Sequence, residues 1–230
     1  MAKGLRRANQ EQPRAWQRML SGRRLDLLDP SPLDIEVEDI AHGLARVARW
    51  NGQTKGPHVF SVAQHSLFVE AIASELAPGL DAPGRLAALL HDAPEYVVGD
   101  LITPLKSVIG GAYGQVEARL LGAVHRRFGL PEIPDAGLRG LIKRADRLAA
   151  GLEATRLAGF SAQEAESVFG RPERLPGDLD TLLSPWPTEQ AVARFRGRAV
   201  ALMGGMAGDG LPVGGGQLPG SPCPSGTECR

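Results

Sequence analysis

The sequence predicts an all-α protein, a bundle of about six or more helices followed by a disordered C-terminal tail. Apolar residues recur at intervals of three and four through most of the central part of the chain, which is the periodicity of an amphipathic helix. The alternation typical of strands is weak, and only residues 24–28 are candidates for a short ribbon. Because 43% of the 230 residues are hydrophobic, one domain over residues 23–203 can bury a full core.

The periodic segments define the predicted helices in chain order. The first covers residues 37–50 and is expected to end near Arg49–Trp50, before a loop with two glycines and a proline at 51–57. The second covers residues 62–76. The third carries the apolar residues of 86–93 and should kink or stop at Pro94, because proline cannot donate a hydrogen bond to the Leu90 carbonyl. Three further helices are predicted over residues 114–128, 138–157 and 188–203.

Residues 204–230 form the predicted tail. They are rich in glycine and proline and have hardly any periodic apolar residues, so they cannot bury enough surface to offset the entropy lost on ordering. Both cysteines, Cys223 and Cys229, lie in this tail, where a disulfide would connect no structural elements. We therefore expect a cytoplasmic protein without structural disulfides.

Charge and hydropathy exclude several classes of partner. Lys+Arg and Asp+Glu balance at 26 each, so no net field attracts polymeric nucleic acid or an anionic membrane, and we expect neither as a partner. No apolar run approaches the roughly 20 residues of a membrane span, and residues 1–12 lack the apolar segment of a signal peptide. An anionic substrate must then be met by a local cluster or a metal. The sequence leaves a homodimer or a higher homo-oligomer open.

Three segments place ionisable side chains on faces that should be buried. His65 lies in the apolar series 62, 65, 69, 72 and 76, so its imidazole should point into the bundle. His91 and Asp92 follow the apolar run 86–90 and are expected deep in that buried helix. Asp146 lies beside the core face of a third helix. A buried carboxylate without a partner is too costly, so these residues need a cation or several hydrogen-bond donors.

Two imidazoles and two carboxylates pointing inward suit a divalent metal with mixed nitrogen and oxygen ligands. Such a site leaves coordination positions for water and a phosphoryl oxygen, and the metal lowers the pKa of that water. The alternative is a buried histidine–aspartate network without metal. Either pair alone favours the network. The four residues together favour one divalent cation, and the sequence does not distinguish Mn, Co, Zn and Mg.

An ordered set of motifs between residues 35 and 160 surrounds these four residues. The motifs are Arg49-Trp50, Val62-Ala-Gln-His-Ser66, Leu90-His-Asp-Ala-Pro-Glu95, Gly99-Asp-Leu-Ile-Thr-Pro-Leu-Lys106 and Lys143-Arg-Ala-Asp-Arg147. With the spacing of His65, His91-Asp92 and Asp146, the set resembles the HD-domain metal-dependent phosphohydrolases, and more narrowly the bacterial HD-domain 5′-deoxynucleotidases. The resemblance implies an all-α HD fold. It also implies an enzyme that releases phosphate from deoxyribonucleoside 5′-monophosphates by attack of a metal-activated water.

The resemblance also assigns roles to four residues near the metal ligands. Glu95 and Asp100 assist the attack, Arg49 contacts the 5′-phosphate, and Trp50 excludes the 2′-hydroxyl of a ribonucleotide. Each has a structural alternative. Glu95 can be a helix-end carboxylate and Asp100 a turn cap, while Arg49 and Trp50 can be a favourable cation and an anchor at a helix C-terminus.

The remaining histidines and one lysine are less informative. His58 precedes the second helix, and Lys106 follows a Thr-Pro pair, so both can meet phosphate, although an exposed loop position explains them equally well. His42 and His125 are interpreted as surface residues, because they stand beside Asp39 and Arg126-Arg127.

Other activities remain as alternatives. A deoxynucleoside triphosphate triphosphohydrolase of the small HD type shares the metal set and would be favoured by extra basic residues. A guanosine-tetraphosphate hydrolase would need an acidic pair where Glu95 is followed by Tyr96, and a cyclic-nucleotide phosphodiesterase would need more histidines. A non-catalytic nucleotide sensor predicts a damaged ligand set, whereas all four ligands are present.

Overall fold

The structure, a computed structural model, describes residues 14–171 and 179–207 of the chain. Nine α-helices and a single two-stranded sheet account for most of these residues, so the all-α prediction is confirmed. The α-helices are α1 Val37–Leu44, α2 Val62–Leu76, α3 Ala82–Leu89, α4 Glu95–Val98, α5 Thr103–Ile109, α6 Gly111–Arg127, α7 Ala136–Arg156, α8 Ala162–Phe169 and α9 Thr188–Ala207. The strands are β1 Trp16–Arg18 and β2 Arg24–Asp26, and short 3-10 turns cover Pro32–Asp34, Arg49–Gly52 and Asp180–Leu183.

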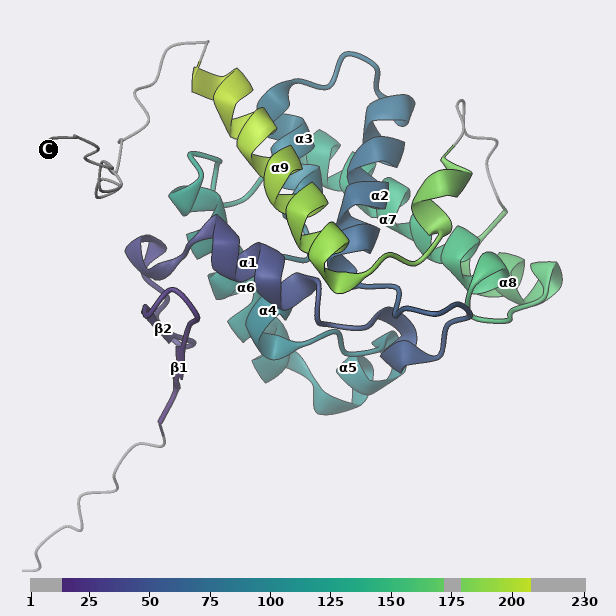
Figure 1. The fold of residues 1–230 in the computed structure, drawn as a ribbon, viewed down its shortest axis with the longest axis horizontal. Coiled ribbons are helices and arrows are strands. Elements are labelled where there is room, and N and C mark those ends of the chain that lie inside the picture. The colour runs from purple at the N-terminus through teal and green to yellow at the C-terminus, as the bar shows by residue number, and fades with distance from the viewer. Residues whose placement is uncertain (1–13, 172–178, 208–230) are drawn as a thin grey trace, which may run out of the picture.

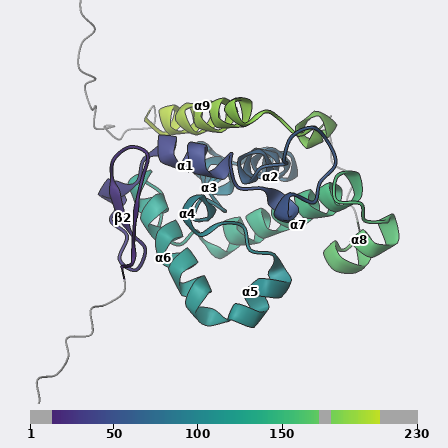
Figure 2. The same ribbon diagram turned by 60° about the horizontal axis from the view of Figure 1, so that its bottom comes forward.

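Helix α2 lies at the centre of the bundle. It packs against α7, α3 and α9, and α9 in turn crosses α1 and α3 (Figures 1 and 2). Buried apolar side chains form two clusters, and both include α2: Ala63 belongs to one, and Phe68 to the other. His65 lies between these two positions and is fully buried. The packing of α2 therefore places an ionisable group in the middle of the protein.

The helix starts follow local hydrogen-bonding rules. Ser61 caps α2 by accepting a hydrogen bond from the Gln64 amide, and Asp81 and Asp135 cap α3 and α7 in the same way. A reciprocal capping box begins α8 at Ser161. The predicted bounds of the second helix, 62–76, are confirmed by α2. None of the described helices is long and apolar enough to span a membrane.

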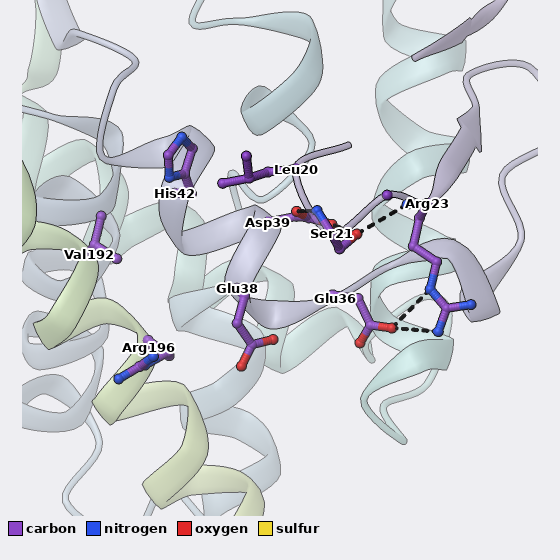
Figure 3. A pocket seen from close by; sticks show the side chains of 10 residues that line it. Leu20, Ser21, Arg23, Glu36, Glu38, Asp39, His42, Val192 and Arg196 are labelled. Carbon is purple, nitrogen blue, oxygen red and sulfur yellow. Dashed lines mark hydrogen bonds and ion pairs between the residues drawn. The ribbon is translucent and has the colours of Figure 1, made fainter. Parts of the chain in front are cut away.

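The hairpin β1–β2 is antiparallel and lies at one end of the bundle (Figure 2). Ser21, in its turn, donates hydrogen bonds from its backbone amide and hydroxyl to Asp39 on α1, and Arg23 pairs with Glu36 at 2.8 Å (Figure 3). Buried Leu25 fixes the inner face of the hairpin. The expected ribbon at 24–28 is therefore one strand of a hairpin that starts at residue 16, before the predicted domain boundary at 23.

The first helix ends earlier than the sequence predicts. The prediction extended it to Arg49–Trp50, but α1 ends at Leu44 and the chain becomes extended at Ala48, which forms a β-bridge with Ser61. Arg49 continues this pairing by donating its amide hydrogen to the Phe60 carbonyl at 2.8 Å. Pairing between distant segments here outweighs helical periodicity, and it moves Arg49 and Trp50 from a helix end to a turn.

The third helix also ends early. The sequence placed His91 and Asp92 deep in a helix that Pro94 would end, but α3 stops at Leu89. Residues 90–94 form a turn, and Pro94 becomes the residue that precedes α4. Proline disfavours helical backbone in the residue before it, and Pro94 has no N–H to donate to the Leu90 carbonyl. Both site residues therefore lie on a turn.

The last helix continues beyond its predicted end. It was expected to stop at Met203, with disorder from Gly204 onward, but α9 continues to Ala207, and Met206 packs against the core. Residues 208–230, with both cysteines, lie outside the described residues, as do residues 1–12. The division into a domain at 23–203 and a tail stays a prediction.

Candidate metal centre

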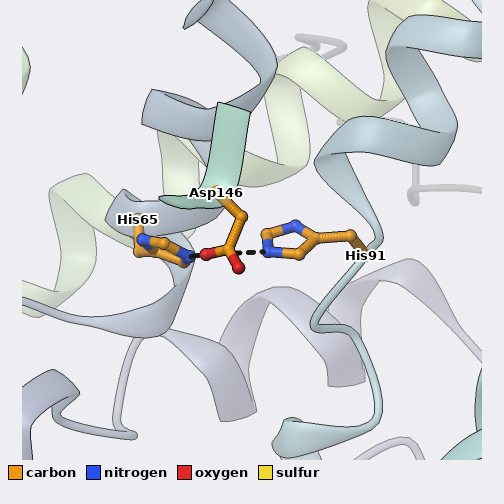
Figure 4. Close-up of side chains that lie close together, drawn as sticks. All are labelled: His65, His91 and Asp146. Atoms are coloured by element: carbon orange, nitrogen blue, oxygen red, sulfur yellow. Dashed lines mark ion pairs between the residues drawn. The ribbon is translucent and has the colours of Figure 1, made fainter. Parts of the chain in front are cut away.

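Three segments bring the four sequence-predicted ligands together. His65 comes from α2, His91 and Asp92 from the turn between α3 and α4, and Asp146 from α7. One ligand atom each from His65, His91 and Asp146 lies within 4.8 Å of the others (Figure 4). Asp92 joins them, because its Oδ2 lies 3.5 Å from His65 Nε2 and 3.2 Å from His91 Nε2. The cluster thus has two nitrogen and two carboxylate donors, a set that could hold a divalent cation.

The inward-facing imidazole nitrogens fit metal ligation. His65 Nε2 and His91 Nε2 are buried, and neither has a hydrogen-bond partner with acceptable geometry in the described structure. Asp146 Oδ1 is 3.2 Å from His65 Nε2 without forming such a bond. Buried polar atoms are normally paired, so two orphaned nitrogens that converge on two carboxylates match a cation site better than a closed hydrogen-bond network.

Hydrogen bonds on the outer side of each ring orient the two imidazoles. His91 Nδ1 lies 2.9 Å from the Ala88 carbonyl, which can only accept, so the Nδ1 atom carries the hydrogen. His65 Nδ1 lies 2.5 Å from Glu153 Oε1. When each ring is neutral, its Nε2 lone pair then faces the cluster, the arrangement that outer partners impose on metal-binding histidines.

The cluster carries an excess of negative charge. Burial and the nearby Arg49 oppose protonation of His65, but Glu153, Asp146 and Asp92 outweigh them and raise its pKa well above the ordinary value. The Asp92 and Asp146 side chains are 24% and 41% exposed, so the cluster is open to solvent on their side. A cation would compensate the charge, and water or a phosphate group could reach it from that side.

Glu95 lies in the first turn of α4 and is 2% exposed. Its Oε1 is 3.4 Å from Lys106 Nζ, and its Oε2 has no hydrogen-bond partner in the described structure. Burial, with the Asp92 and Asp100 carboxylates nearby, raises the pKa of Glu95 to about 9, although Lys106 and Arg49 oppose the rise. The residue is therefore a proton-carrying group beside the predicted ligands.

Arg49 and Trp50 are held by a second set of contacts. Arg49 Nη1 lies 3.4 Å from Asp100 Oδ2, so the structure joins two residues that the sequence assigned to the site separately. The Trp50 indole packs edge-on against Phe160 and Phe169, with ring centroids 5.6 and 6.0 Å away. Trp50 has φ 57°, a left-handed conformation that is uncommon for a residue with a side chain.

Glu153 is the site residue that sequence reasoning missed. It is fully buried on α7, and its carboxylate contacts His65 Nδ1, Trp50 Nε1 at 2.9 Å and Arg49 Nε at 3.4 Å. Burial opposes ionisation, but His65 and Arg49 lower the pKa of Glu153 to about 2. A signal was available, because Glu153 lies two helical turns after Asp146, on the same face of the helix.

The other predicted positions lie in different surroundings. Lys106 is paired with Glu117 at 3.0 Å as well as with Glu95, and His58 is exposed on the loop before α2. The interpretation of His125 as a surface residue is wrong, because it is 2% exposed and its Nδ1 bonds to the Pro131 carbonyl at 3.1 Å. His42 is half-buried.

His42 lines a pocket of about 780 Å³ between the hairpin, α1 and α9 (Figure 3). None of the predicted ligands or substrate-binding residues lines this pocket. Its polar side chains include Ser21, Asp39, Arg23 and Glu36, which bond to one another and fasten the hairpin. The polar side chains of this pocket therefore have a structural role, which is to attach the hairpin to α1.

Comparison with known proteins gives relatives but no activity. No family model matches the chain. The chain is 55% identical over 196 residues to the uncharacterized protein RCAP_rcc00048 of Rhodobacter capsulatus, and the match covers 85% of this chain and 99% of that protein. It is 33% identical over 100 residues to the uncharacterized protein YfdR of Escherichia coli, covering 44% of this chain and 51% of YfdR. Neither name states a function.

Proposed function

The chain belongs to the family of the Rhodobacter capsulatus protein RCAP_rcc00048, and we propose that it is a metal-dependent phosphohydrolase acting on deoxyribonucleoside 5′-monophosphates. One observation carries the proposal. Two buried imidazole nitrogens without hydrogen-bond partners converge on two partly exposed carboxylates, beside a buried glutamate and an arginine. The motif resemblance supplies the substrate class.

His65, His91, Asp92 and Asp146 would hold the cation. When bound, a divalent cation supplies Lewis acidity, which lowers the pKa of a water molecule and neutralises charge on phosphoryl oxygens. The donor set of two nitrogens and two carboxylates is compatible with Mn, Co, Zn or Mg.

The chain's own residues position the substrate and move the proton. The Arg49 guanidinium is planar and matches a phosphate group, and its contacts with Asp100 and Glu153 at 3.4 Å are long enough for a phosphate to compete. Glu95, which carries a proton at neutral pH, donates it to the departing 5′ oxygen and recovers one from the attacking water. The phosphorus–water bond forms as the bond to the 5′ oxygen breaks, leaving inorganic phosphate and a deoxyribonucleoside. Asp100 keeps Arg49 directed at the site.

A monophosphate suits the charges better than a triphosphate. Both cations assigned to the substrate are already paired with carboxylates: Arg49 with Asp100 and Glu153, and Lys106 with Glu95 and Glu117. A triphosphate carries about two more negative charges than a monophosphate. The carboxylates of the site already offset Arg49 and Lys106, so neither cation is left free to meet these extra charges in the described contacts. A deoxynucleoside triphosphate triphosphohydrolase is therefore the second candidate, and a non-catalytic nucleotide sensor the third.

The test is phosphate release by purified protein that is first stripped of metal and then given Mn, Co, Zn or Mg. We expect inorganic phosphate from deoxyribonucleoside 5′-monophosphates with at least one of these metals and none without metal. Release of tripolyphosphate from triphosphates would favour the second candidate. Nucleotide binding without turnover under all conditions would favour the sensor.

A further inference from the structure

The carboxylate of Glu153 touches both halves of the candidate site. Its Oε1 contacts the predicted metal ligand His65, and its Oε2 contacts the substrate-side residues Arg49 and Trp50. We propose that Glu153 is a positioning residue that couples cation binding to substrate binding. Its effect on the cation is independent of the reaction, whereas its effect on substrate rests on the proposed function.

The first half of the coupling concerns His65. An ionised carboxylate can only accept hydrogen bonds, so the 2.5 Å contact fixes the hydrogen of His65 on Nδ1. In neutral His65 the lone pair of Nε2 then points toward Asp92 and Asp146, where a cation would be held. The His65 ring is completely buried, and Glu153 is the partner of its Nδ1 atom in the described structure. Outer-shell partners of this kind typically change metal affinity by about 10–100-fold when they are removed.

The second half concerns the turn at Arg49 and Trp50. Trp50 and Asn51 have φ values of 57° and 50°, so two consecutive residues with side chains hold a left-handed backbone. Such conformations persist only where surrounding contacts hold them. The Trp50 Nε1–Glu153 bond is one such contact, and the edge-on packing of the indole on Phe160 and Phe169 is another. Glu153 also accepts the Nε hydrogen of Arg49, while Nη1 of the same guanidinium contacts Asp100.

The two carboxylate oxygens therefore have different partners, and a single substitution should disturb both the contact with His65 and the turn at Arg49 and Trp50. In Glu153→Gln the amide offers one acceptor oxygen and two amide hydrogens, so it cannot accept from His65, Trp50 and Arg49 as the carboxylate does. We expect metal affinity to fall about 10-fold or more. At saturating metal we expect a raised KM for the nucleotide, because the turn that holds Arg49 has lost its anchor.

Glu70 provides the matched control. Like Glu153 it is a buried glutamate, 4% exposed, and it pairs with Arg85 and Arg198 to join α2, α3 and α9. Glu70→Gln also removes a buried charge from an ion-pair network, but it touches none of the predicted ligands. We expect this variant to lose thermal stability while it keeps wild-type metal affinity.

Two measurements test the coupling without any turnover. Cobalt titration followed by visible absorption gives metal affinity, and the indole N–H resonance of Trp50, assigned with Trp50→Phe, reports the bond to Glu153. We expect Glu153→Gln to weaken cobalt binding and to shift this resonance, and Glu70→Gln to do neither. Wild-type cobalt affinity and an unshifted resonance in Glu153→Gln would overturn the coupling, as would equal effects in Glu70→Gln.

The inference stays testable if Glu153→Gln does not fold. Trp50→Phe removes the indole hydrogen and keeps an aromatic ring, so it should shift the His65 Nδ1–H resonance through the shared carboxylate. An unchanged His65 resonance would contradict the coupling. If no nucleotide is hydrolysed by wild type, the proposed function fails, while the titration and the resonances still decide the role of Glu153.

Discussion

The most informative single change is Asp146→Ala, which should remove cation-dependent stabilisation while it costs the metal-free fold little. Asp146 contributes one carboxylate to the cluster, with Oδ1 3.2 Å from His65 Nε2. Its side chain is 41% exposed, so truncation leaves no closed cavity in the core. The loss should appear in metal binding and only weakly in the free energy of unfolding without metal.

The magnitude follows from linkage between binding and folding. A cation present at 100 times its Kd stabilises the folded state by about 2.7 kcal/mol. For a protein of this size, each kcal/mol raises the Tm by about 2–4 °C, so wild type should gain about 5–11 °C. If Asp146→Ala weakens binding about 100-fold, the same cation concentration gives only about 0.4 kcal/mol, and the Tm should rise by less than about 2 °C.

Leu89→Ala is the contrasting variant. Leu89 is fully buried in the core, and truncating such a leucine costs about 2–5 kcal/mol. Its Tm without metal should therefore fall by several degrees more than that of Asp146→Ala. The rise on adding metal should nevertheless stay close to that of wild type, because the four ligands are intact.

The assay is thermal unfolding of each protein in chelator and in excess Mn or Co. An equal metal-dependent rise in wild type and Asp146→Ala would show that Asp146 is not a ligand. Loss of the rise in Leu89→Ala would show that the effect reports general stability instead of the cluster.

Three further predictions follow from particular contacts. Trp50→Ala should narrow the preference for deoxy over ribo monophosphates. In wild type we expect this preference to be about 5–150-fold, because a stranded 2′-hydroxyl costs roughly 1–3 kcal/mol. Arg49→Ala should lower the specificity constants for both nucleotides alike, and an unchanged ratio in Trp50→Ala would leave the indole as an anchor. A chain ending at Ala207 should keep wild-type Tm and turnover. A shorter chain without Met206 should have a lower Tm, because that side chain packs against the core. A large loss of Tm or turnover in the chain ending at Ala207 would show that the tail docks on the domain. Burial opposes ionisation of Glu70, but two arginines lower its pKa below the ordinary 4.5. The ionised carboxylate should therefore stabilise the fold fully above pH 4.5, and this stabilisation should be lost as pH falls through the lowered pKa. The difference in unfolding free energy between wild type and Glu70→Gln should shrink in acid, and a difference that stays constant with pH would contradict this.

Helix α2 shows what sequence reasoning could reach. Its apolar series predicted both the bounds 62–76 and the inward direction of His65, because periodicity and a serine cap act locally. The same reasoning predicted that the four ligands, which come from three segments, lie close together. Local rules therefore predicted the all-α architecture and the cluster.

The errors arise where distant contacts decide the conformation. The first helix was extended through Arg49, but pairing of Ala48 with Ser61 ends the helical region before it. Close packing adds a further constraint, since a β-carbon at Gly43 would lie 2.8 Å from the Tyr96 side chain, where α1 meets α4. Neither contact leaves a periodic signal in the local sequence.

Glu153 illustrates a different gap. Its position on the buried face of α7 was visible, but a glutamate in a helix is usually exposed and carries no motif. Only the three-dimensional structure shows that one carboxylate meets an imidazole, an indole and a guanidinium. Charge in a core register two turns from a predicted ligand is the signal that such a search should include.

The most direct test of the metal centre is anomalous diffraction from crystals grown with Mn or Co. The account predicts one strong peak per chain, about 2.0–2.2 Å from the Nε2 atoms of His65 and His91 and from carboxylate oxygens of Asp92 and Asp146. A peak at another location, or none between these four side chains at saturating metal, would contradict the central claim.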